Sequence, residues 1–407
     1  MKALTRWPRH PEPDDGEALS SWLTRVAAAN CLSLTELLGN LSDPTFQTLG
    51  RESSDLDRDP PQEFLAEISG RTGRTAELLR AMTLAGLVPT VMDTLNPSDD
   101  PEVFSRYVHQ HQILLTPRSI RSRATPGWQA WLPSTPLRRA CPACVADTAP
   151  TPRLRLLGQL PLTLTCPDHG CYLESIDGVY ESRVLWTDSQ HDPRDAPPAM
   201  KAMDRRTHDA LRTGVVTLPR REVTAAVWFR LVRTLLDELA TFPTHAGRYK
   251  ATLHAIWDRI GEPPRAGQMM WCTYEALRRP RQEKFLEAAA AAIDMIESGT
   301  IKPAGADGQL FLPPPPPPTA RLSTTGGRWR RGLSEMSSEE LWQEVRKNFV
   351  RAISLARKDP AAADELFRFL AWGPGGTDKA RTILADLNIT VPSPSHNNDS
   401  APSRVIE

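Results

Sequence analysis

The pattern of apolar and polar positions in the first hundred residues predicts two pairs of short helices. Apolar side chains recur three and four positions apart at the start of the first pair: Leu19, Trp22, Leu23, Val26 and Ala27. The pattern stops near Asn30. Ser33 and Glu36 then have the spacing of a capping box, in which each side chain bonds the backbone N–H of the other residue. A second helix is therefore expected just after Ser33, and the two helices form a compact hairpin.

The second pair has the length and punctuation of a helix-turn-helix unit. Pro61 precedes one expected helix at 62–68, and Gly73 marks the turn. Thr75 can cap a second helix at 76–84. Two basic side chains belong to this second member, Arg74 and Arg80. A helix-turn-helix would place them in a DNA major groove, whereas a plain helical hairpin would leave them in solvent.

Longer helices are predicted further along the chain. A stripe of apolar residues indicates a buried helix over 222–239: Val223, Val227, Leu231, Leu235 and Leu239. Further helices are expected at 249–260, 273–279 and 282–297. Near the C-terminus, a capping-box pair at Ser337 and Glu340 predicts another helix, and a shorter one is expected at 361–372. The second half of the chain is therefore predicted to be helical.

A run of six prolines interrupts this helical half. Pro313–Pro318 predicts an extended polyproline segment, and a stiff spacer is a better interpretation of it than a ligand for an aromatic groove. The polar sequence from Pro392 to Glu407 predicts a disordered tail.

Composition narrows the class of protein. Hydrophobic residues make up 40% and charged residues 24% of the 407 residues, which is typical of a soluble globular chain. No run of 18 apolar residues occurs, so no membrane contact is expected. Residues 1–10 lack the apolar core of a signal peptide. We therefore expect a cytoplasmic protein with reduced cysteines, in which clustered cysteines bind metal rather than form disulfides.

Two turns have the ligand spacing of a zinc site. Cys141 and Cys144 form a C-x2-C pair, and Cys166 and His169 form a C-x2-H pair after a 21-residue insert. Each pair offers two soft ligands from one turn, so together they can surround Zn²⁺ with three sulfurs and one nitrogen. A closed quartet leaves no position for a substrate water, which predicts one structural zinc ion.

The residues around this quartet extend the prediction. The insert has strand-like apolar sequence over 154–165, which favours a β-hairpin that joins the two turns. Gly170 permits a left-handed bend after His169. Cys171 is the alternative fourth ligand, because it lies two positions beyond His169. The two isolated cysteines are interpreted as small core residues, Cys31 and Cys272.

Together these patterns predict a mainly α chain with N-terminal helix-turn-helix units, a small zinc-finger β-hairpin module and a helical C-terminal half. The expected division is into an N-terminal helical region, the zinc-finger module, a helical domain, a Pro-rich linker, a C-terminal helical region and a disordered tail: 1–100, 101–180, 181–308, 309–330, 331–390 and 391–407.

Charge is unevenly distributed although the formal net charge is zero. Residues 11–70 contain twelve acidic and three basic side chains, whereas 116–155 contain seven arginines and one acid. The second segment should attract phosphate and the first should repel it. The residues that we expect at a DNA face are therefore arginines: Arg74, Arg80, Arg118, Arg121, Arg123, Arg138 and Arg139.

Signatures of common enzyme classes do not occur in the sequence. It contains no G-x-x-x-x-G-K-[ST] phosphate loop and no H-E-x-x-H metalloprotease motif. It also lacks the H-x-E of a zinc deaminase. A chain without catalytic activity is expected.

Three stretches of sequence carry a family resemblance. Residues 16–23 are similar to an E-S-L-x-S-W-L opening, and residues 80–84 to an R-x-M-T-L segment. Residues 139–144 and 164–173 look like a C-P-x-C … C-x-x-H-G-x-x-L zinc finger. These stretches resemble the TniQ family of transposition proteins over roughly residues 8–175, and the remainder is similar only as a helical half.

The resemblance implies a targeting adaptor of transposition. Family members help to choose an insertion site and recruit an AAA+ ATPase regulator, which then engages a transposase. DNA, that ATPase and, indirectly, the transposase are therefore the implied partners. The acidic segment 11–70 is then expected to dock the ATPase. The resemblance leaves open a self-dimer, and whether a guide-RNA complex or a resolvase system supplies target specificity.

Two other functions fit parts of the sequence. A zinc-containing DNA-binding regulator unconnected with transposition would share the metal site and the arginines. The genes beside its own would separate the two, because a transposase and an ATPase should be neighbours of an adaptor. A metalloenzyme would need an open coordination position, which a four-ligand site excludes.

Overall fold

The computed structural model divides the chain into two compact units, residues 1–316 and 317–407. The boundary falls within the six-proline run. The structure describes residues 6–46, 53–116, 123–133, 137–148, 151–180, 183–187 and 192–314, together with parts of 350–390, of which 376–390 is the longest. Most of the proline run, and the tail predicted at 391–407, lie outside the described residues.

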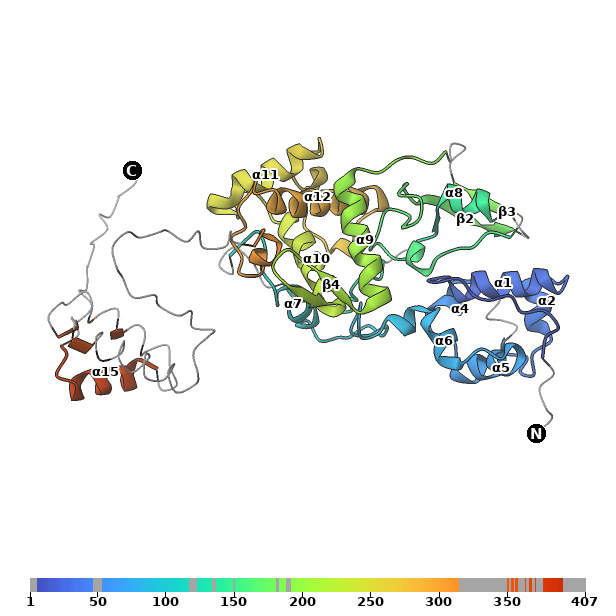
Figure 1. Cartoon of the computed structure of the whole chain (residues 1–407), viewed down its shortest axis with the longest axis horizontal. Helices are drawn as coiled ribbons and strands as arrows, with labels where there is room; N and C mark the ends of the chain where they lie inside the picture. Colours follow the sequence, from blue (N-terminus) through green and yellow to red (C-terminus); the bar gives the residue numbers. More distant parts are fainter. Residues whose placement is uncertain are drawn as a thin grey trace, which may run out of the picture. The chain divides into compact units, whose positions relative to one another are not determined.

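Short helices form the N-terminal region (Figure 1). They are α1 (Leu19–Ala29), α2 (Leu34–Gly39), α4 (Ser53–Arg58), α5 (Gln62–Thr72) and α6 (Ala76–Ala81). The capping box of Ser33 and Glu36 is present at the start of α2. Thr75 caps α6 by accepting a hydrogen bond from the N–H of Leu78. These local signals confirm the helices predicted in this region.

The helix α6 is shorter than the sequence indicates. It ends at Ala81 and is followed by a 3-10 turn, η1 (Leu84–Leu87). The chain folds back onto the helix end there and packs closely against it. A Cβ added at Gly86 would lie only 2.4 Å from the carbonyl oxygen of Arg80. Helices α5 and α6 pack together around the left-handed turn at Gly73. Their use as a DNA-reading helix-turn-helix stays a prediction.

A small antiparallel sheet and two short helices make up the middle of the first unit. The sheet has the order β1 (Arg139–Ala140), β2 (Glu174–Tyr180), β3 (Arg183–Trp186). The short helices here are α7 (Val103–Val108) and α8 (Pro142–Asp147). The predicted β-strand within 154–165 is wrong. That insert contains the 3-10 turn η3 (Leu156–Gln159), and the hairpin β2–β3 follows the second ligand pair instead of joining the two pairs.

Four helices form the body of the first unit (Figure 1). They are α9 (Pro198–Thr213), α10 (Ala225–Leu239), α11 (Lys250–Arg259) and α12 (Arg279–Glu297). The helices predicted at 222–239, 249–260 and 282–297 are confirmed with small shifts, whereas 273–279 contains only the 3-10 turn η6 (Tyr274–Ala276). A two-stranded sheet joins α9 to α10 through β4 (Val215–Thr217) and β5 (Glu222–Thr224). The other 3-10 turns among the described residues are η4 (Gly247–Tyr249), η5 (Pro264–Gly267) and η7 (Asp307–Phe311).

Buried charges hold the body together. The carboxylate of Glu238 accepts hydrogen bonds from three successive backbone N–H groups, at residues 113–115. Arg233 is fully buried and pairs with Glu275 at 2.8 Å. A large apolar core that includes Trp131, Trp228 and Trp257 surrounds these charges. The N-terminal helices have a separate core of their own. The first unit therefore contains two large apolar cores.

The second unit is described at α15 (Gly376–Asp386) and at scattered positions before it. Leu384 and Ile389 pack with a few of those earlier residues. The helix expected after Ser337 lies outside the described residues, apart from a few positions near its end. No described helix of the chain has the length and apolar character that a membrane crossing requires.

Candidate metal centre

The first ligand pair lies at the start of α8. Cys141 is the N-cap residue, and its sulfur accepts a hydrogen bond from the N–H of Cys144 at 3.4 Å. Pro142 occupies the first turn of the helix, where a backbone N–H would have no helical partner. The helix start therefore fixes both sulfurs of the C-x2-C pair.

The second ligand pair lies in a tight turn. The N–H of Gly170 donates to the carbonyl oxygen of Cys166 at 2.9 Å, and the N–H of Cys166 donates to that of Cys171 at 2.9 Å. Gly170 has a φ of +64°, which confirms the left-handed bend expected after His169. This turn brings the C-x2-H pair to α8.

The four predicted ligands meet in space. Nδ1 of His169 lies 3.3–3.6 Å from all three sulfurs, those of Cys141, Cys144 and Cys166. The sulfurs of Cys144 and Cys166 are 3.5 Å apart, and all four ligand atoms lie within 4.8 Å of one another. The close approach lowers the pKa of Cys141, because Cys144 and Cys166 bond to its sulfur. The cluster can hold one metal ion.

The donor set fits zinc. A tetrahedron built with normal Zn–S and Zn–N bond lengths has edges of about 3.5–3.8 Å, close to the separations within this cluster. Three thiols with one imidazole are a usual donor set of structural zinc sites. All four coordination positions would be taken by protein side chains, which leaves none for a substrate.

A fifth residue, which the ligand spacing does not predict, orients the histidine. Nε2 of His169 lies 3.0 Å from a carboxylate oxygen of Asp147, on the side away from the sulfurs. Asp147 ends α8 one turn after Cys144, so the helix that presents two ligands also presents this carboxylate. Metal-bound histidines commonly donate their second N–H to such a carboxylate. The signal in the sequence was the helical i, i+3 spacing from Cys144.

Cys171 lies beside the cluster. Its sulfur is buried and lies 3.4 Å from that of Cys141. The mutually close group of ligand atoms contains His169 and not Cys171. The geometry therefore favours His169 as the fourth ligand.

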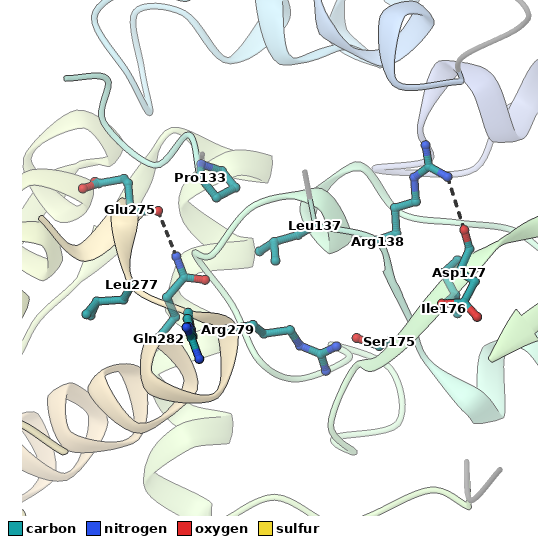
Figure 2. A pocket seen from close by; sticks show the side chains of 11 residues that line it. Pro133, Leu137, Arg138, Ser175, Ile176, Asp177, Glu275, Leu277, Arg279 and Gln282 are labelled. Carbon is teal, nitrogen blue, oxygen red and sulfur yellow. Dashed lines mark hydrogen bonds between the residues drawn. The ribbon is translucent and has the colours of Figure 1, made fainter. Parts of the chain in front are cut away.

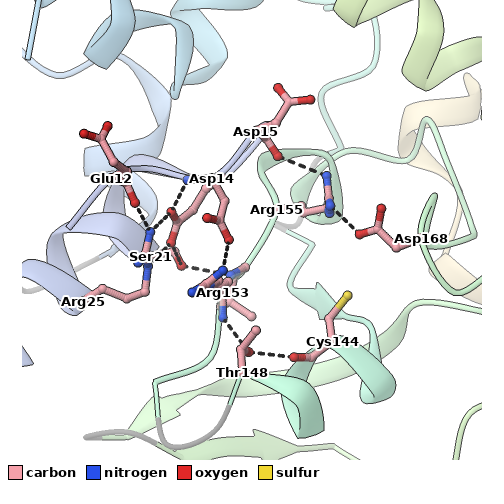
Figure 3. Close-up of polar contacts among 12 residues, drawn as sticks. Glu12, Asp14, Asp15, Ser21, Arg25, Cys144, Thr148, Arg153, Arg155 and Asp168 are labelled. Atoms are coloured by element: carbon pink, nitrogen blue, oxygen red, sulfur yellow. Dashed lines mark hydrogen bonds and ion pairs between the residues drawn. The ribbon is translucent and has the colours of Figure 1, made fainter.

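The insert between the ligand pairs docks on the N-terminal helices (Figure 3). The N–H of Ala18 donates to the carbonyl oxygen of Leu154 at 2.9 Å, and the N–H of Leu156 donates to that of Gly16 at 2.9 Å. Two arginines of the insert support this contact. Arg153 pairs with Asp14 at 2.6 Å, and Arg155 donates to the backbone oxygen of Asp15. Hydrogen bonds and an ion pair thus connect the N-terminal helices directly to residues 139–186, which contain the cysteine cluster and the small sheet and are called the metal module below.

A buried acid organises the N-terminal side of this contact. Glu17 is 1% exposed and pairs with Arg25 at 2.6 Å. It also accepts hydrogen bonds from the hydroxyl of Ser21 and the N–H of Asp14. The hydroxyl of Ser21 in turn accepts a bond from the N–H of Leu154 in the insert. One carboxylate therefore connects the start of α1 to the metal module.

A comparison with protein families identifies this arrangement. The TniQ family model matches residues 8–173, a span that contains the N-terminal helices and the four clustered cysteine and histidine residues. Residues 8–173 form a TniQ domain. The match covers less than half of the chain. No curated protein and no solved structure matches the chain.

The first two stretches that resemble the TniQ family lie in contact within the structure, and the first also contacts the insert of the third. The N–H of Leu19, in the first stretch, donates to the carbonyl oxygen of Met82 in the second at 3.0 Å. The indole N–H of Trp22 donates to the carbonyl oxygen of Pro11 at 2.8 Å. Glu17, of the first stretch, forms an isolated backbone bridge with Arg155 of the zinc-finger insert. The TniQ sequence pattern therefore describes one packed region.

One arginine of the expected DNA face is buried. Arg139 is 4% exposed, and its guanidinium donates to the carbonyl oxygens of Gly158 and Leu160. Burial lowers its pKa to about 10. The prediction that Arg139 contacts DNA is therefore wrong for the folded chain, because its donors are used to fix the insert. Arg138, its neighbour, is exposed.

The other expected DNA residues differ in their accessibility. Arg74 is half-buried and pairs with Glu12, and Arg123 pairs with Asp237 and lies over the ring of Trp271. Arg80 is 52% exposed, with a long 3.7 Å contact to Asp59. Two further members lie outside the described residues, Arg118 and Arg121. Of the arginines expected at a DNA face, Arg80 and Arg138 are therefore the accessible ones among the described residues.

Several acidic side chains of the N-terminal segment 11–70 are buried inside the TniQ domain, where they accept hydrogen bonds. Besides Glu17, Asp57 is buried and accepts hydrogen bonds from Ser20 and Gln159. Glu67 is buried and accepts bonds from Ser42. Cys31, expected in the core, is exposed and has a φ of +58° at the end of α1, so that prediction was wrong.

Proposed function

We propose that this chain is a non-catalytic accessory protein of transposition. It marks or selects a target site and recruits an AAA+ ATPase regulator, which then engages the transposase. The observation that carries this proposal is the TniQ match over residues 8–173, because the matched span folds around the clustered cysteines and histidine. The transposition association follows from the family, and the targeting and recruiting roles are our proposal.

The proposed cofactor is one structural zinc ion. Cys141, Cys144, Cys166 and His169 would hold it, and zinc would supply a fixed link between α8 and the turn at Gly170. Metal binding of this kind contributes free energy of folding, because the site does not exist in the unfolded chain. A closed quartet has no open position, which supports a structural role and a chain that is not an enzyme.

The proposed partner surfaces lie on the TniQ domain. Arg80 and Arg138 are exposed cations that can contact DNA phosphates, and Arg118 and Arg121 belong to the same basic segment of sequence. The acids that stay exposed in the N-terminal region, such as Asp15 and Glu63, are the proposed contacts for the ATPase. We further propose that the protein acts in the cytoplasm.

A pull-down with the AAA+ regulator of the same mobile element tests this function. The tagged full chain should retain the ATPase, and more of it when duplex DNA is present. Cys166→Ser should abolish retention because the metal module no longer folds, whereas Cys31→Ser should leave it unchanged because Cys31 is exposed and lies outside the cluster. Equal recovery of the ATPase by wild type and Cys166→Ser, or no recovery by the folded wild type, would contradict the proposal.

A further inference from the structure

A groove lies between the small sheet of the metal module and the start of α12 (Figure 2). Its volume is about 500 Å³. Arg138, Ser175 and Ile176 line it from the module side, and Leu277, Arg278 and Arg279 line it from the helical body. The groove is therefore formed by segments that are up to about 140 residues apart in sequence. A local sequence motif could not predict it.

The groove carries an excess of positive charge. Three guanidinium groups line it, those of Arg138, Arg278 and Arg279. Arg138 and Arg278 are exposed, and neither forms an ion pair with a carboxylate among the described residues. Arg279 is partly neutralised by Glu283 at 2.9 Å. Arg138 is held in place because its Nη1 donates to the backbone oxygen of Asp177 at 3.3 Å.

The acidic residues of the groove do not cancel this charge. The carboxylate of Glu275 points away from the groove in Figure 2, and it is bound by Arg233 at 2.8 and 3.0 Å and by the indole N–H of Trp128. Asp177 is exposed, and its side chain accepts a hydrogen bond from Thr187 at 2.9 Å. The groove is therefore lined by three arginines and by one solvent-facing carboxylate, that of Asp177.

The helix α12 adds to the attraction for an anion. It is 19 residues long and begins at Arg279, with Arg278 as its N-cap residue. The first turn of a helix has backbone N–H groups without helical partners and the positive end of the helix dipole. Because Arg278 and Arg279 lie at this helix start, their charges and the dipole act on the same part of the groove.

We propose that this groove holds phosphate groups of a nucleic-acid strand. The guanidinium group of arginine can form paired hydrogen bonds with phosphate oxygens. Here the arginines come from opposite walls of the groove, so they can contact a strand from two sides. The apolar side chains of Leu137, Ile176 and Leu277 line the groove between them and suit the less polar sugar and base surfaces. This inference rests on the proposed DNA contact of the TniQ protein and adds Arg278 and Arg279 to it.

Equilibrium binding of a labelled duplex of about 30 base pairs by the full chain tests this proposal over a range of salt concentrations. The test variant is Arg138→Ala combined with Arg278→Ala. We expect its affinity to fall at least about tenfold, and the slope of log K against log salt to decrease by about two, one for each lost phosphate contact. Both residues are exposed, so the melting temperature should not change.

The matched control is Arg221→Ala combined with Arg259→Ala. These arginines are exposed, lie outside the groove and have no described ion-pair partner, so this variant has the same net charge as the test variant. It should bind DNA like wild type. Equal losses in both double variants, or wild-type affinity and slope in the groove variant, would overturn the groove and leave the proposed function standing.

A second probe separates the groove from the function on which it rests. Polyglutamate is an acidic polypeptide without phosphate, and we expect it to compete poorly with DNA for the wild-type chain. If wild type binds no DNA at all, the DNA contact of the proposed function fails, and the groove proposal fails with it. Tight polyglutamate binding that the groove variant loses, without DNA binding, would assign the groove to an acidic protein instead.

Discussion

At the scale of single residues, Asp147 holds the His169 ring by the nitrogen that faces away from the three sulfurs. Such a bond fixes the ring orientation and makes the other nitrogen a better ligand. Asp147→Asn should therefore lower zinc affinity by about tenfold. This is the lower end of the effect expected for a group that bonds a metal-bound histidine, because Asp147 is largely exposed. Competition with a chromophoric chelator measures this. Asp192→Asn, an exposed acid outside the cluster, is the control, and equal affinities in all three proteins would contradict the assigned role.

Cys171 provides a second test of the same ligand set. Its sulfur lies near that of Cys141 but outside the mutually close group. We expect Cys171→Ser to retain zinc and His169→Ala to bind it much more weakly, because only the latter loses a ligand. Metal analysis of the two purified variants decides between them. Zinc loss in Cys171→Ser with retention in His169→Ala would identify Cys171 as the fourth ligand.

At the scale of elements, buried and exposed arginines that support the N-terminal contact should differ in energy. Arg25 is buried against Glu17, so Arg25→Ala leaves an unpaired buried carboxylate and should lower the free energy of unfolding by about 3 kcal/mol. Arg153 pairs with Asp14 at a half-exposed position, so Arg153→Ala should cost less than about 1 kcal/mol. Urea unfolding of the zinc-bound proteins, followed by tryptophan fluorescence, measures both. Equal losses would show that the two ion pairs are not distinguished by burial.

A buried acid on α9 should give stability a measurable pH dependence. Asp204 accepts hydrogen bonds from Leu164 and Thr165, just before the second ligand pair, and burial raises its pKa to about 7. Its pKa is higher in the folded state than in the unfolded state. The folded chain therefore holds this proton more tightly, and stability is lost as pH rises from about 4 to about 7.

Asp204→Asn removes this titration and keeps a hydrogen-bond acceptor. From pH 5.5 to 7.5 the wild type should lose roughly 2 kcal/mol of unfolding free energy relative to the variant. Both proteins are compared at saturating zinc, so that the pH dependence of metal binding cancels in the difference. Parallel pH profiles would show that the carboxyl group of Asp204 does not titrate in this range.

Local signals predicted most of the helices, because caps and periodicity act over a few residues. The capping box at Ser33 and the cap at Thr75 are in place. The strand predicted within 154–165 does not form, because the fold of this insert depends on distant contacts. Gly158 packs where a Cβ would meet the carbonyl oxygen of Arg139 at 2.5 Å, and the buried guanidinium of Arg139 bonds the same turn. Apolar sequence alone cannot report either contact.

The candidate site was predictable to a similar extent. Ligand spacing identified Cys141, Cys144, Cys166 and His169, since soft ligands in paired turns at this spacing are typical of metal sites. The sequence could not show which arginines are accessible. Positive charge along the chain does not distinguish a buried guanidinium such as that of Arg139 from an exposed one. The groove could not be predicted from the sequence either, because one of its arginines, Arg278, belongs to the helical body and not to the basic segment.

At the scale of the whole first unit, the metal module lies between two apolar cores. Its insert bonds the N-terminal helices through residues 153–156, and the segment before its second ligand pair bonds Asp204 on α9. A zinc ion would therefore stabilise a region that contacts both cores. Removal of the metal should loosen the N-terminal helices from the body and expose residues 151–156 to protease. Limited proteolysis with and without chelator tests this, and identical digestion patterns would contradict it.

The most direct test of the account is the metal content of the purified full chain. Elemental analysis by mass spectrometry should find one zinc ion per chain in the wild type and in Cys31→Ser, and none in Cys166→Ser, because only Cys166 belongs to the ligand cluster. A wild-type chain that is folded, monodisperse and free of stoichiometric zinc would contradict the claim that this TniQ domain is built around a metal ion.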